Sequence, residues 1–268
     1  MKLKKDFKLF LTIIGAFWLT VSLSACSSSS QSSDQNKDLK LNQKDTLTIG
    51  LEGTYAPYSY RKNGKLTGFE VELGKALAKQ MNLKAKFVPT KWDGLVAGLG
   101  SSKYDVVLND ITKTPARAKS YLFSKPYIYS RFVLITRKDS SINSLKDIKG
   151  QKFAEGTGTN NEQVAKKYGA TTVPSGEFAT TIDLVKQKRV AGTINSREAW
   201  LSYKKTNLTA GLKAIDVSKE QSPAQVVALF NKKSNNLRNK TNQALNKLRQ
   251  NGTLTRLSKK YFGGDITK

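Results

Sequence analysis

Short runs of β-branched and aliphatic residues alternate with helical repeats along most of this 268-residue chain. Residues 46–51 have the pattern of a strand, and the segment after them places Phe69, Leu73, Leu77 and Met81 four residues apart, on one face of a helix. Repeated alternation of strands and helices builds parallel sheets with helices on both faces. The sequence therefore predicts an α/β fold made of parallel sheets.

The same two patterns continue to the end of the chain. Leu95 and Leu99 mark one helix, and Thr114 with Pro115 predicts the start of the next, because threonine caps a helix and proline suits its first turn. We expect further strands at residues 84–88, 104–108, 132–136, 151–154, 190–194 and 213–217. We expect further helices at residues 160–168, 178–188 and 198–205, and across 231–261 with a break at Asn251-Gly252.

The residue types that are missing exclude several chemistries. The chain has no histidine and one cysteine, so a Ser-His-Asp triad, an imidazole base, an ordinary zinc site and an internal disulfide are all excluded. It also lacks the Gly-rich phosphate-binding patterns of nucleotide-binding proteins. We predict neither a metal nor a cofactor.

The first 26 residues look like an export sequence. Residues 9–23 are apolar and follow four lysines, and a stretch of 15 residues is shorter than the roughly 20 that span a bilayer. Leu23-Ser24-Ala25-Cys26 resembles the lipobox of bacterial lipoproteins. We expect residues 1–25 to be a signal peptide, Cys26 to carry a lipid anchor and residues 26–45 to form a Ser-rich tether. The alternative is a plain signal peptide followed by a chance cysteine.

The chain is strongly basic, with a net charge of +26. Removal of residues 1–25 takes away four lysines and one aspartate, which leaves +23. For an exported protein, the polyanions within reach are wall polymers, anionic lipid headgroups and host glycans. The aromatic residues do not interleave with the lysines as a base-stacking surface requires, so nucleic acid is not expected. A solvated, mutually repelling surface is the simpler interpretation of the charge.

Seven motifs occur in an order that resembles a known family. Together they are similar to the polar amino-acid-binding proteins of bacterial ABC importers, solute-binding protein family 3. The motifs are Gly50-Leu51-Glu52-Gly53-Thr54-Tyr55-Ala56-Pro57-Tyr58, Leu66-Thr67-Gly68-Phe69-Glu70-Val71-Glu72-Leu73, Trp92-Asp93-Gly94-Leu95, Thr112-Lys113-Thr114-Pro115-Ala116-Arg117, Phe123-Ser124-Lys125-Pro126-Tyr127, Ser144-Leu145-Lys146-Asp147-Ile148-Lys149-Gly150 and Gly156-Thr157-Gly158-Thr159.

The resemblance implies a two-lobed periplasmic-binding-protein-like fold of type II, with a ligand cleft between the lobes. By this analogy, residues 46–134 and 226–268 form lobe 1, and residues 135–225 form lobe 2. Two hinge crossings, near residues 132–137 and 226–230, would join the lobes. The protein would close on an amino acid and deliver it to a membrane permease without catalysing a reaction.

An α-amino acid brings a carboxylate and an ammonium, and leaving either charge unpaired in a closed cleft is costly. Arg117, just inside the helix that begins at Pro115, is the residue that we expect to pair with the carboxylate. The segment from Gly156 to Thr159 lies between a strand and a helix, so we expect Thr157, Gly158 and Thr159 to form a second anion-binding element.

The resemblance assigns other residues to the ligand. Tyr55 and Trp92 match positions that stack on its aliphatic part, Thr112 and the backbone around Asp110 match the ammonium-facing segment, and Glu52 matches an acid that contacts its distal end. Asn195 and Ser196 align with a segment that carries Asp at the position of Ser196 in many relatives. Serine cannot neutralise an ammonium, so Asp110, Glu52 or Glu155 must substitute, or neutral acceptors and water bind the amine. The sequence also leaves open the alternative that the ligand is not a standard α-amino acid.

The asparagines around residues 109, 160, 161 and 195 look most like the cystine-binding branch of the family. Cystine is therefore the expected ligand, with glutamine, glutamate, a basic amino acid or a short peptide as alternatives. We expect a monomer, anchored through Cys26 on the outer face of the cell membrane. Two other functions stay open: an adhesin that binds anionic wall or host polymers, and an enzyme similar to the cyclohexadienyl dehydratases with Glu52 or Glu155 as its acid.

Overall fold

The computed structural model describes residues 38–268. The predicted signal peptide, the lipidation site at Cys26 and most of the predicted tether lie outside the described residues. Residues Leu39–Lys268 form one compact unit. No helix between residues 38 and 268 is long and apolar enough to cross a membrane.

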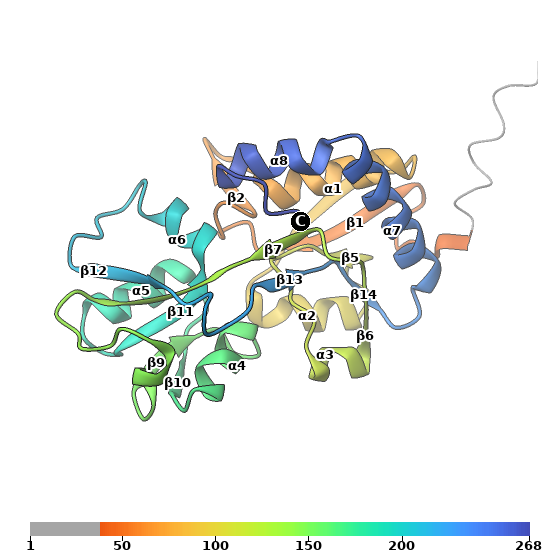
Figure 1. Ribbon diagram of the computed structural model, residues 1–268. Helices are drawn as coiled ribbons and strands as arrows, with labels where there is room; N and C mark the ends of the chain where they lie inside the picture. Colours follow the sequence, from red (N-terminus) through yellow and green to blue (C-terminus); the bar gives the residue numbers. More distant parts are fainter. Residues whose placement is uncertain (1–37) are drawn as a thin grey trace, which may run out of the picture. The chain divides into compact units, whose positions relative to one another are not determined.

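Two five-stranded sheets organise this unit (Figure 1). We call each sheet with its helices a lobe. The sheet of the first lobe has the order β4 (Lys84–Pro89), β1 (Thr46–Leu51), β5 (Val106–Val107), β14 (Leu229–Asn231) and β6 (Tyr121–Phe123). The sheet of the second lobe has the order β10 (Thr171–Pro174), β9 (Lys152–Glu155), β11 (Gly192–Ser196), β8 (Phe132–Arg137) and β12 (Leu212–Asp216).

The expectation of purely parallel sheets is wrong at one strand in each lobe. β14 runs antiparallel to β5 and β6, and β8 runs antiparallel to β11 and β12. Each of these strands is the first to follow a passage of the chain from the other sheet, so it does not arrive through a strand–helix–strand unit of its own lobe. The remaining strands of each sheet are parallel.

A short antiparallel pair lies between the two sheets along the chain. β7 (Ile128–Ser130) precedes β8, β13 (Ala224–Val226) precedes β14, and the two short strands pair with each other. The chain therefore passes through this pair both when it enters the second sheet and when it returns. A separate hairpin, β2 (Tyr60–Lys62) and β3 (Lys65–Thr67), projects from the first lobe.

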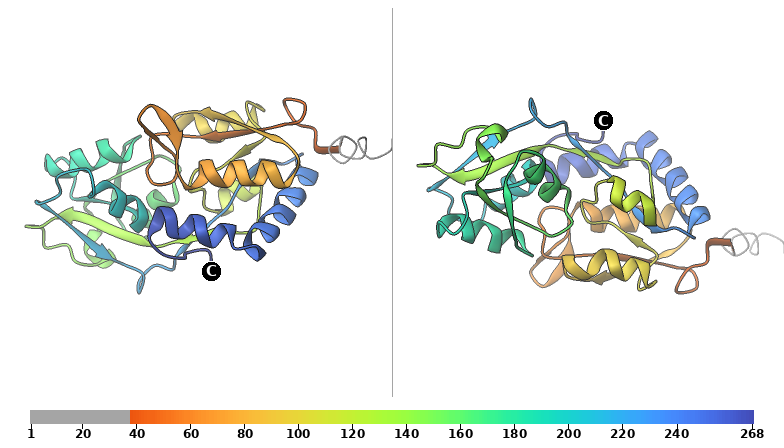
Figure 2. Two further views of the ribbon diagram at one scale, coloured as in Figure 1. Left: turned by 90° about the horizontal axis from the view of Figure 1, so that it is seen from above. Right: turned by 90° about the horizontal axis from the view of Figure 1, so that it is seen from below.

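Helices cover both faces of the first sheet. α1 (Phe69–Gln80), α7 (Asn235–Gln250) and α8 (Thr253–Phe262) pack on one face and α2 (Trp92–Gly100) on the other, as the two views of Figure 2 show in turn. Side chains of a strand alternate between faces, so Val106 and Leu108 join the core under α1 whereas Val107 joins the core under α2. The short helix α3 (Pro115–Ser120) lies next to β6.

The second lobe repeats this arrangement with α4 (Asn160–Lys167), α5 (Phe178–Lys186) and α6 (Arg197–Tyr203), and a 3₁₀ turn, η2 (Leu145–Ile148), precedes β9. Phe132 and Leu134 of β8 face the core that includes α4, and Val133 and Ile135 face the core that includes α5 and α6. β8 is therefore buried on both faces. Its run of apolar residues is what a central strand requires.

Candidate functional site

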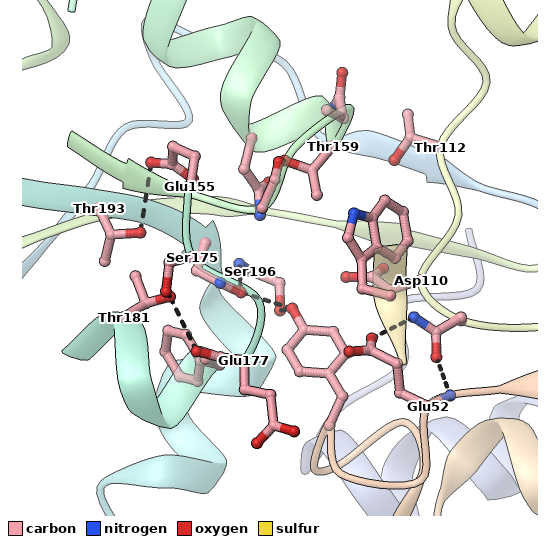
Figure 3. Close-up of a pocket in the computed structure, with 18 of the residues that line it drawn as sticks. Glu52, Asp110, Thr112, Glu155, Thr159, Ser175, Glu177, Thr181, Thr193 and Ser196 are labelled. Atoms are coloured by element: carbon pink, nitrogen blue, oxygen red, sulfur yellow. Dashed lines mark hydrogen bonds between the residues drawn. The ribbon is translucent and has the colours of Figure 1, made fainter. Parts of the chain in front are cut away.

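A pocket lies between the two sheets of the unit, with about 770 Å³ of space that includes its mouth to solvent. Both lobes line it. Figure 3 shows the first-lobe residues Glu52, Asp110 and Thr112 on one wall, across from the second-lobe residues Glu155, Thr193 and Ser196.

The pocket lies at the ends of four strands. β1 ends just before Glu52, β5 ends shortly before Asp110, β9 ends at Glu155 and β11 ends at Ser196. Parallel strands of one sheet end at the same edge, and ligands of open α/β sheets bind beyond that edge. The pocket is therefore made by two such edges that face each other.

Arg117 reaches the pocket from the start of α3. Thr114 caps this helix by accepting a hydrogen bond from the Arg117 backbone N–H. The guanidinium donates to the carbonyl oxygens of Thr112 (2.8 Å) and Gly158 (3.0 Å), and its Cζ lies 5.4 Å from the ring centre of Trp92. Burial lowers the pKa of Arg117 to about 10. None of the described carboxylates forms an ion pair with it, so an anion is what this buried cation lacks.

The Gly-Thr-Gly-Thr segment differs from the simple anion loop that we expected. Thr159 caps α4 and lines the pocket, whereas Thr157 and Gly158 are not among the lining residues. The Gly158 N–H is occupied by the Glu162 carboxylate at 2.7 Å. The Thr157 carbonyl accepts the Trp92 indole N–H at 2.8 Å, in parallel with the bond from Arg117 to the Gly158 carbonyl. This segment connects the two lobes, and its contact with a ligand stays a prediction.

A third hydrogen bond joins the lobes at the other end of the pocket. The Tyr55 hydroxyl donates to Asn195 Oδ1 at 2.6 Å and lies 3.5 Å from Ser196 Oγ. Asn195 Oδ1 also accepts the Ser196 N–H, and Ser196 Oγ accepts the Ala199 N–H as the cap of α6. The polar acceptors at the end of β11 are therefore engaged within the protein.

Glu52 and Asn109 form a pair at the end of β1. The Asn109 amide donates to Glu52 Oε2 at 2.6 Å, and the Glu52 N–H donates to Asn109 Oδ1 at 2.8 Å. Burial raises the pKa of Glu52 to about 7, with Glu177 and Asp93 adding charge repulsion and the Asn109 bond opposing the shift. The side chain can thus be charged or neutral near neutral pH.

Three more carboxylates are enclosed in or beside the pocket. Burial raises the pKa of Glu155 and of Asp110 well above their usual values, and the pKa of Glu70 to about 7. Glu155 accepts the Ile194 N–H at 2.7 Å, and Glu70 accepts the Asp110 N–H at 2.7 Å and the Tyr127 hydroxyl. The pocket therefore offers several acids and one guanidinium, which suits a ligand that carries both charges.

The pocket gathers nine of the eleven predicted ligand residues. They are Glu52, Tyr55, Trp92, Asp110, Thr112, Arg117, Thr159, Asn195 and Ser196. In the described part of the chain, no group of three or more acidic, histidine or cysteine side chains could hold a metal ion.

The family follows from comparison with known proteins. The sequence profile of the bacterial extracellular solute-binding proteins, family 3, matches residues 47–264. The chain belongs to this family.

Members of family 3 with known ligands are similar to this one over nearly their whole length. The L-cystine-binding protein TcyA of Bacillus subtilis is 37% identical over 256 residues, which cover 92% of this chain and 94% of TcyA. The L-cystine-binding protein TcyJ of Escherichia coli is 36% identical, with 93% and 95% covered. The structure of an ancestral arginine-binding protein bound to arginine superposes with a TM-score of 0.76 at 33% identity, over 82% of this chain and 99% of that one.

Some lining residues of this family 3 member were not in the predicted set of eleven. Asn109, Glu155, Phe132, Ser175 and Glu177 all line the pocket. Two of these had been considered from the sequence: Asn109 for the resemblance to the cystine-binding branch, and Glu155 as an alternative partner of the ammonium. Ser175 and Glu177 lie on the loop before α5, and only the packing of that loop brings them to the pocket.

Proposed function

We propose that this chain is the amino-acid-binding protein of an ABC importer, with an α-amino acid as the ligand of the pocket. One observation carries the proposal: the Arg117 guanidinium is buried between the lobes and has no carboxylate partner among the described residues. A buried cation without a counter-ion is costly, and a ligand carboxylate would supply two charge-assisted hydrogen bonds.

The ligand-binding residues in this proposal are those of the sequence interpretation. Arg117 binds the carboxylate, Tyr55 and Trp92 enclose the aliphatic part, and Glu52 contacts the distal end. The full set is Glu52, Tyr55, Trp92, Asp110, Thr112, Arg117, Thr157, Gly158, Thr159, Asn195 and Ser196.

Hinge closure is the mechanism that we propose. By the family resemblance, we propose boundaries at residues 46–134 and 226–268 for lobe 1 and at 135–225 for lobe 2, which divide β8 because the chain crosses between the lobes there. A ligand stabilises the state that it binds better, and Arg117, Trp92 and Tyr55 each line the pocket and also bond to the other lobe. Ligand contacts and closure therefore involve the same side chains, and the closed form docks on a membrane permease.

Cystine is the ligand that we favour, because TcyA and TcyJ bind it and resemble this chain over most of their length. A thermal-shift panel tests this on protein that starts at Ser27 and has been refolded to remove bound ligand. The panel holds the twenty amino acids and cystine near neutral pH. A ligand at a hundred times its Kd adds about 2.7 kcal/mol of stability. A selective shift with cystine is expected; no shift with any compound contradicts amino-acid binding.

We also propose that Cys26 carries the lipid anchor, which holds a monomer on the outer face of the cell membrane. The support is the lipobox-like sequence before Cys26. Metabolic labelling of cells that express the wild type and Cys26→Ala with a radioactive fatty acid tests it. Label is expected on the wild type and not on the variant; an unlabelled wild type contradicts the anchor.

We propose that the protein is not an enzyme. Glu52 and Glu155 are the acids named from the sequence for a dehydratase-like reaction, and both side chains are engaged in hydrogen bonds within the pocket wall. Incubation with prephenate and arogenate is expected to leave both unchanged. Turnover that is lost in Glu155→Gln or Glu52→Gln contradicts this part of the proposal.

A second function, adhesion to anionic polymers, is favoured by one surface feature. A second groove is lined by Arg61, Lys62, Lys205 and Lys260 and by no acidic side chain. Salt-dependent binding of wall polymer or a sulfated glycan, equal in the wild type and in Arg117→Ala, is the result expected for such a surface. Binding that is lost in Arg117→Ala would assign it to the ligand pocket instead.

A further inference from the structure

The ammonium of an amino acid needs an acceptor with a free oxygen in the pocket. Four carboxylate side chains line it: Glu52 and Asp110 from the first lobe, and Glu155 and Glu177 from the second. Each can be judged by what its oxygens already bind.

The end of β11 offers no charged acceptor. Asn195 Oδ1 already accepts two hydrogen bonds, from the Tyr55 hydroxyl at 2.6 Å and from the Ser196 N–H at 2.8 Å. Ser196 Oγ caps α6 by accepting the Ala199 N–H at 3.1 Å and keeps a second lone pair. This neutral oxygen can add a hydrogen bond to a ligand ammonium, but it cannot neutralise the charge.

The acids other than Asp110 are less suited. One oxygen of Glu52 is held by the Asn109 amide, and Glu155 Oε1 is held by the Ile194 N–H and faces the Thr193 hydroxyl. Glu177 is solvent-exposed, so water already satisfies its carboxylate. A solvated acid contributes little to a buried ion pair.

Asp110 is the exception. Its Oδ1 is buried and has no hydrogen-bond partner among the described residues. The residue is held in a left-handed conformation (φ 48°) by its own N–H, which donates to buried Glu70 at 2.7 Å. Desolvation and the carboxylates of Glu70 and Glu198 raise the pKa of Asp110 well above its usual value, and the hydroxyls of Tyr58 and Tyr55 only partly oppose this shift. A cation beside Oδ1 would remove this imbalance.

Arg117 has the opposite requirement: its buried guanidinium forms no ion pair with any of the described carboxylates. Asp110 lies in the loop between β5 and α3, Arg117 lies in the first turn of α3, and both line the pocket. A buried carboxylate oxygen and a buried guanidinium in one pocket match the two charges of an α-amino acid.

We propose that Asp110 binds the ligand's α-ammonium, so that both charged anchors of the ligand come from the first lobe. This inference rests on the proposed function. It makes a free α-ammonium a requirement for tight binding, and it lets the first lobe bind the charged end of the ligand before the second lobe closes with hydrogen bonds and packing.

The test compares amino acids with analogues that lack the α-amino group. L-cystine, L-arginine and L-glutamine are titrated by calorimetry beside 3,3′-dithiodipropionate, 5-guanidinopentanoate and glutaramate. The measured quantity is the ratio of the Kd of the analogue to the Kd of its amino acid. Loss of a charge-assisted bond in a dry pocket predicts a wild-type ratio of at least about 30.

Asp110→Asn is the informative variant, and Glu155→Gln is the matched control. Both remove one buried carboxylate from the same pocket without a change in size. Asparagine also tolerates the left-handed backbone of position 110, so the fold is expected to persist. Asp110→Gly, which adopts a positive φ without strain, is the second variant if the first does not fold.

In Asp110→Asn the ratio is expected to fall more than fivefold, and in Glu155→Gln the discrimination is expected to remain. A smaller fall in Asp110→Asn overturns the assignment, as does collapse of the ratio in Glu155→Gln alone. A wild type that binds an amino acid and its analogue equally well also overturns it. A wild type that binds none of the six compounds overturns the proposed function itself, and with it the role of Asp110 in binding the ammonium.

Discussion

Glu70 shows how one buried residue supports the pocket without lining it. It stands in the first turn of α1, fully buried, and its Oε1 accepts the Asp110 N–H and the Tyr127 hydroxyl. Its Oε2 is buried without a hydrogen-bond partner among the described residues. Burial raises the pKa of Glu70 to about 7. The charged form is therefore disfavoured in the folded state.

This shift predicts a pH dependence of stability without ligand. The folded state holds the Glu70 proton more tightly than the unfolded state, whose pKa is 4.5, so the cost of ionisation grows as pH rises from about 4.5 to 7 and stability falls. Glu70→Gln avoids this cost, and a shift of this size is worth about 3 kcal/mol. In urea unfolding, the free energy of unfolding of Glu70→Gln should exceed that of the wild type by up to about 3 kcal/mol at pH 8. The two should differ little at pH 4.5. An equal difference at both pH values contradicts the assignment.

Residue-level prediction from sequence succeeded where the cause is local. Thr114 and Pro115 locate the start of α3, and with it the position of Arg117, because capping needs only neighbouring residues. The bond from Asp110 to Glu70 spans 40 residues, and the use of Ser196 as a helix cap depends on where α6 begins. Such contacts follow from packing, which no short pattern encodes.

At the scale of elements, α6 depends on its cap. Ser196 is the last residue of β11 and the N-cap of α6. Ser196→Ala removes the acceptor for the Ala199 N–H and should cost about 1 kcal/mol of unfolding free energy, whereas Ser196→Asp should keep the cap. Urea unfolding without ligand measures both. Equal stability of Ser196→Ala and the wild type would show that the cap does not matter.

Most elements could be predicted, and the failures share a cause. β1 was predicted with its bounds, and α1, β4, α4 and the break between α7 and α8 nearly so. The strand expected at 104–108 is only Val106–Val107, and β14 overlaps the crossing expected at residues 226–230. The short strands β2, β3, β6, β7, β10 and β13 were not predicted. The unpredicted strands have three or four residues and exist through pairing with other strands, which also sets their direction.

At the scale of the whole unit, hydrogen bonds of Tyr55, Trp92 and Arg117 join the lobes around the pocket. Trp92→Phe keeps an aromatic ring but removes the N–H that donates to the Thr157 carbonyl. The bond forms only when the lobes meet, so its loss should act on ligand release and raise koff about fivefold, the effect of about 1 kcal/mol. Stopped-flow fluorescence or surface plasmon resonance measures this. A slower association with unchanged koff would contradict it.

The central claim is that Arg117 binds a ligand carboxylate, and calorimetry on Arg117→Ala tests it most directly. The ligand is the amino acid that shifts the wild type most in the thermal panel, and the control is Lys113→Ala, an exposed cation on the same segment that does not line the pocket. Arg117→Ala should fold and lose at least about 100-fold in affinity, the effect of two charge-assisted hydrogen bonds. Lys113→Ala should bind like the wild type. Wild-type affinity in Arg117→Ala would contradict the account.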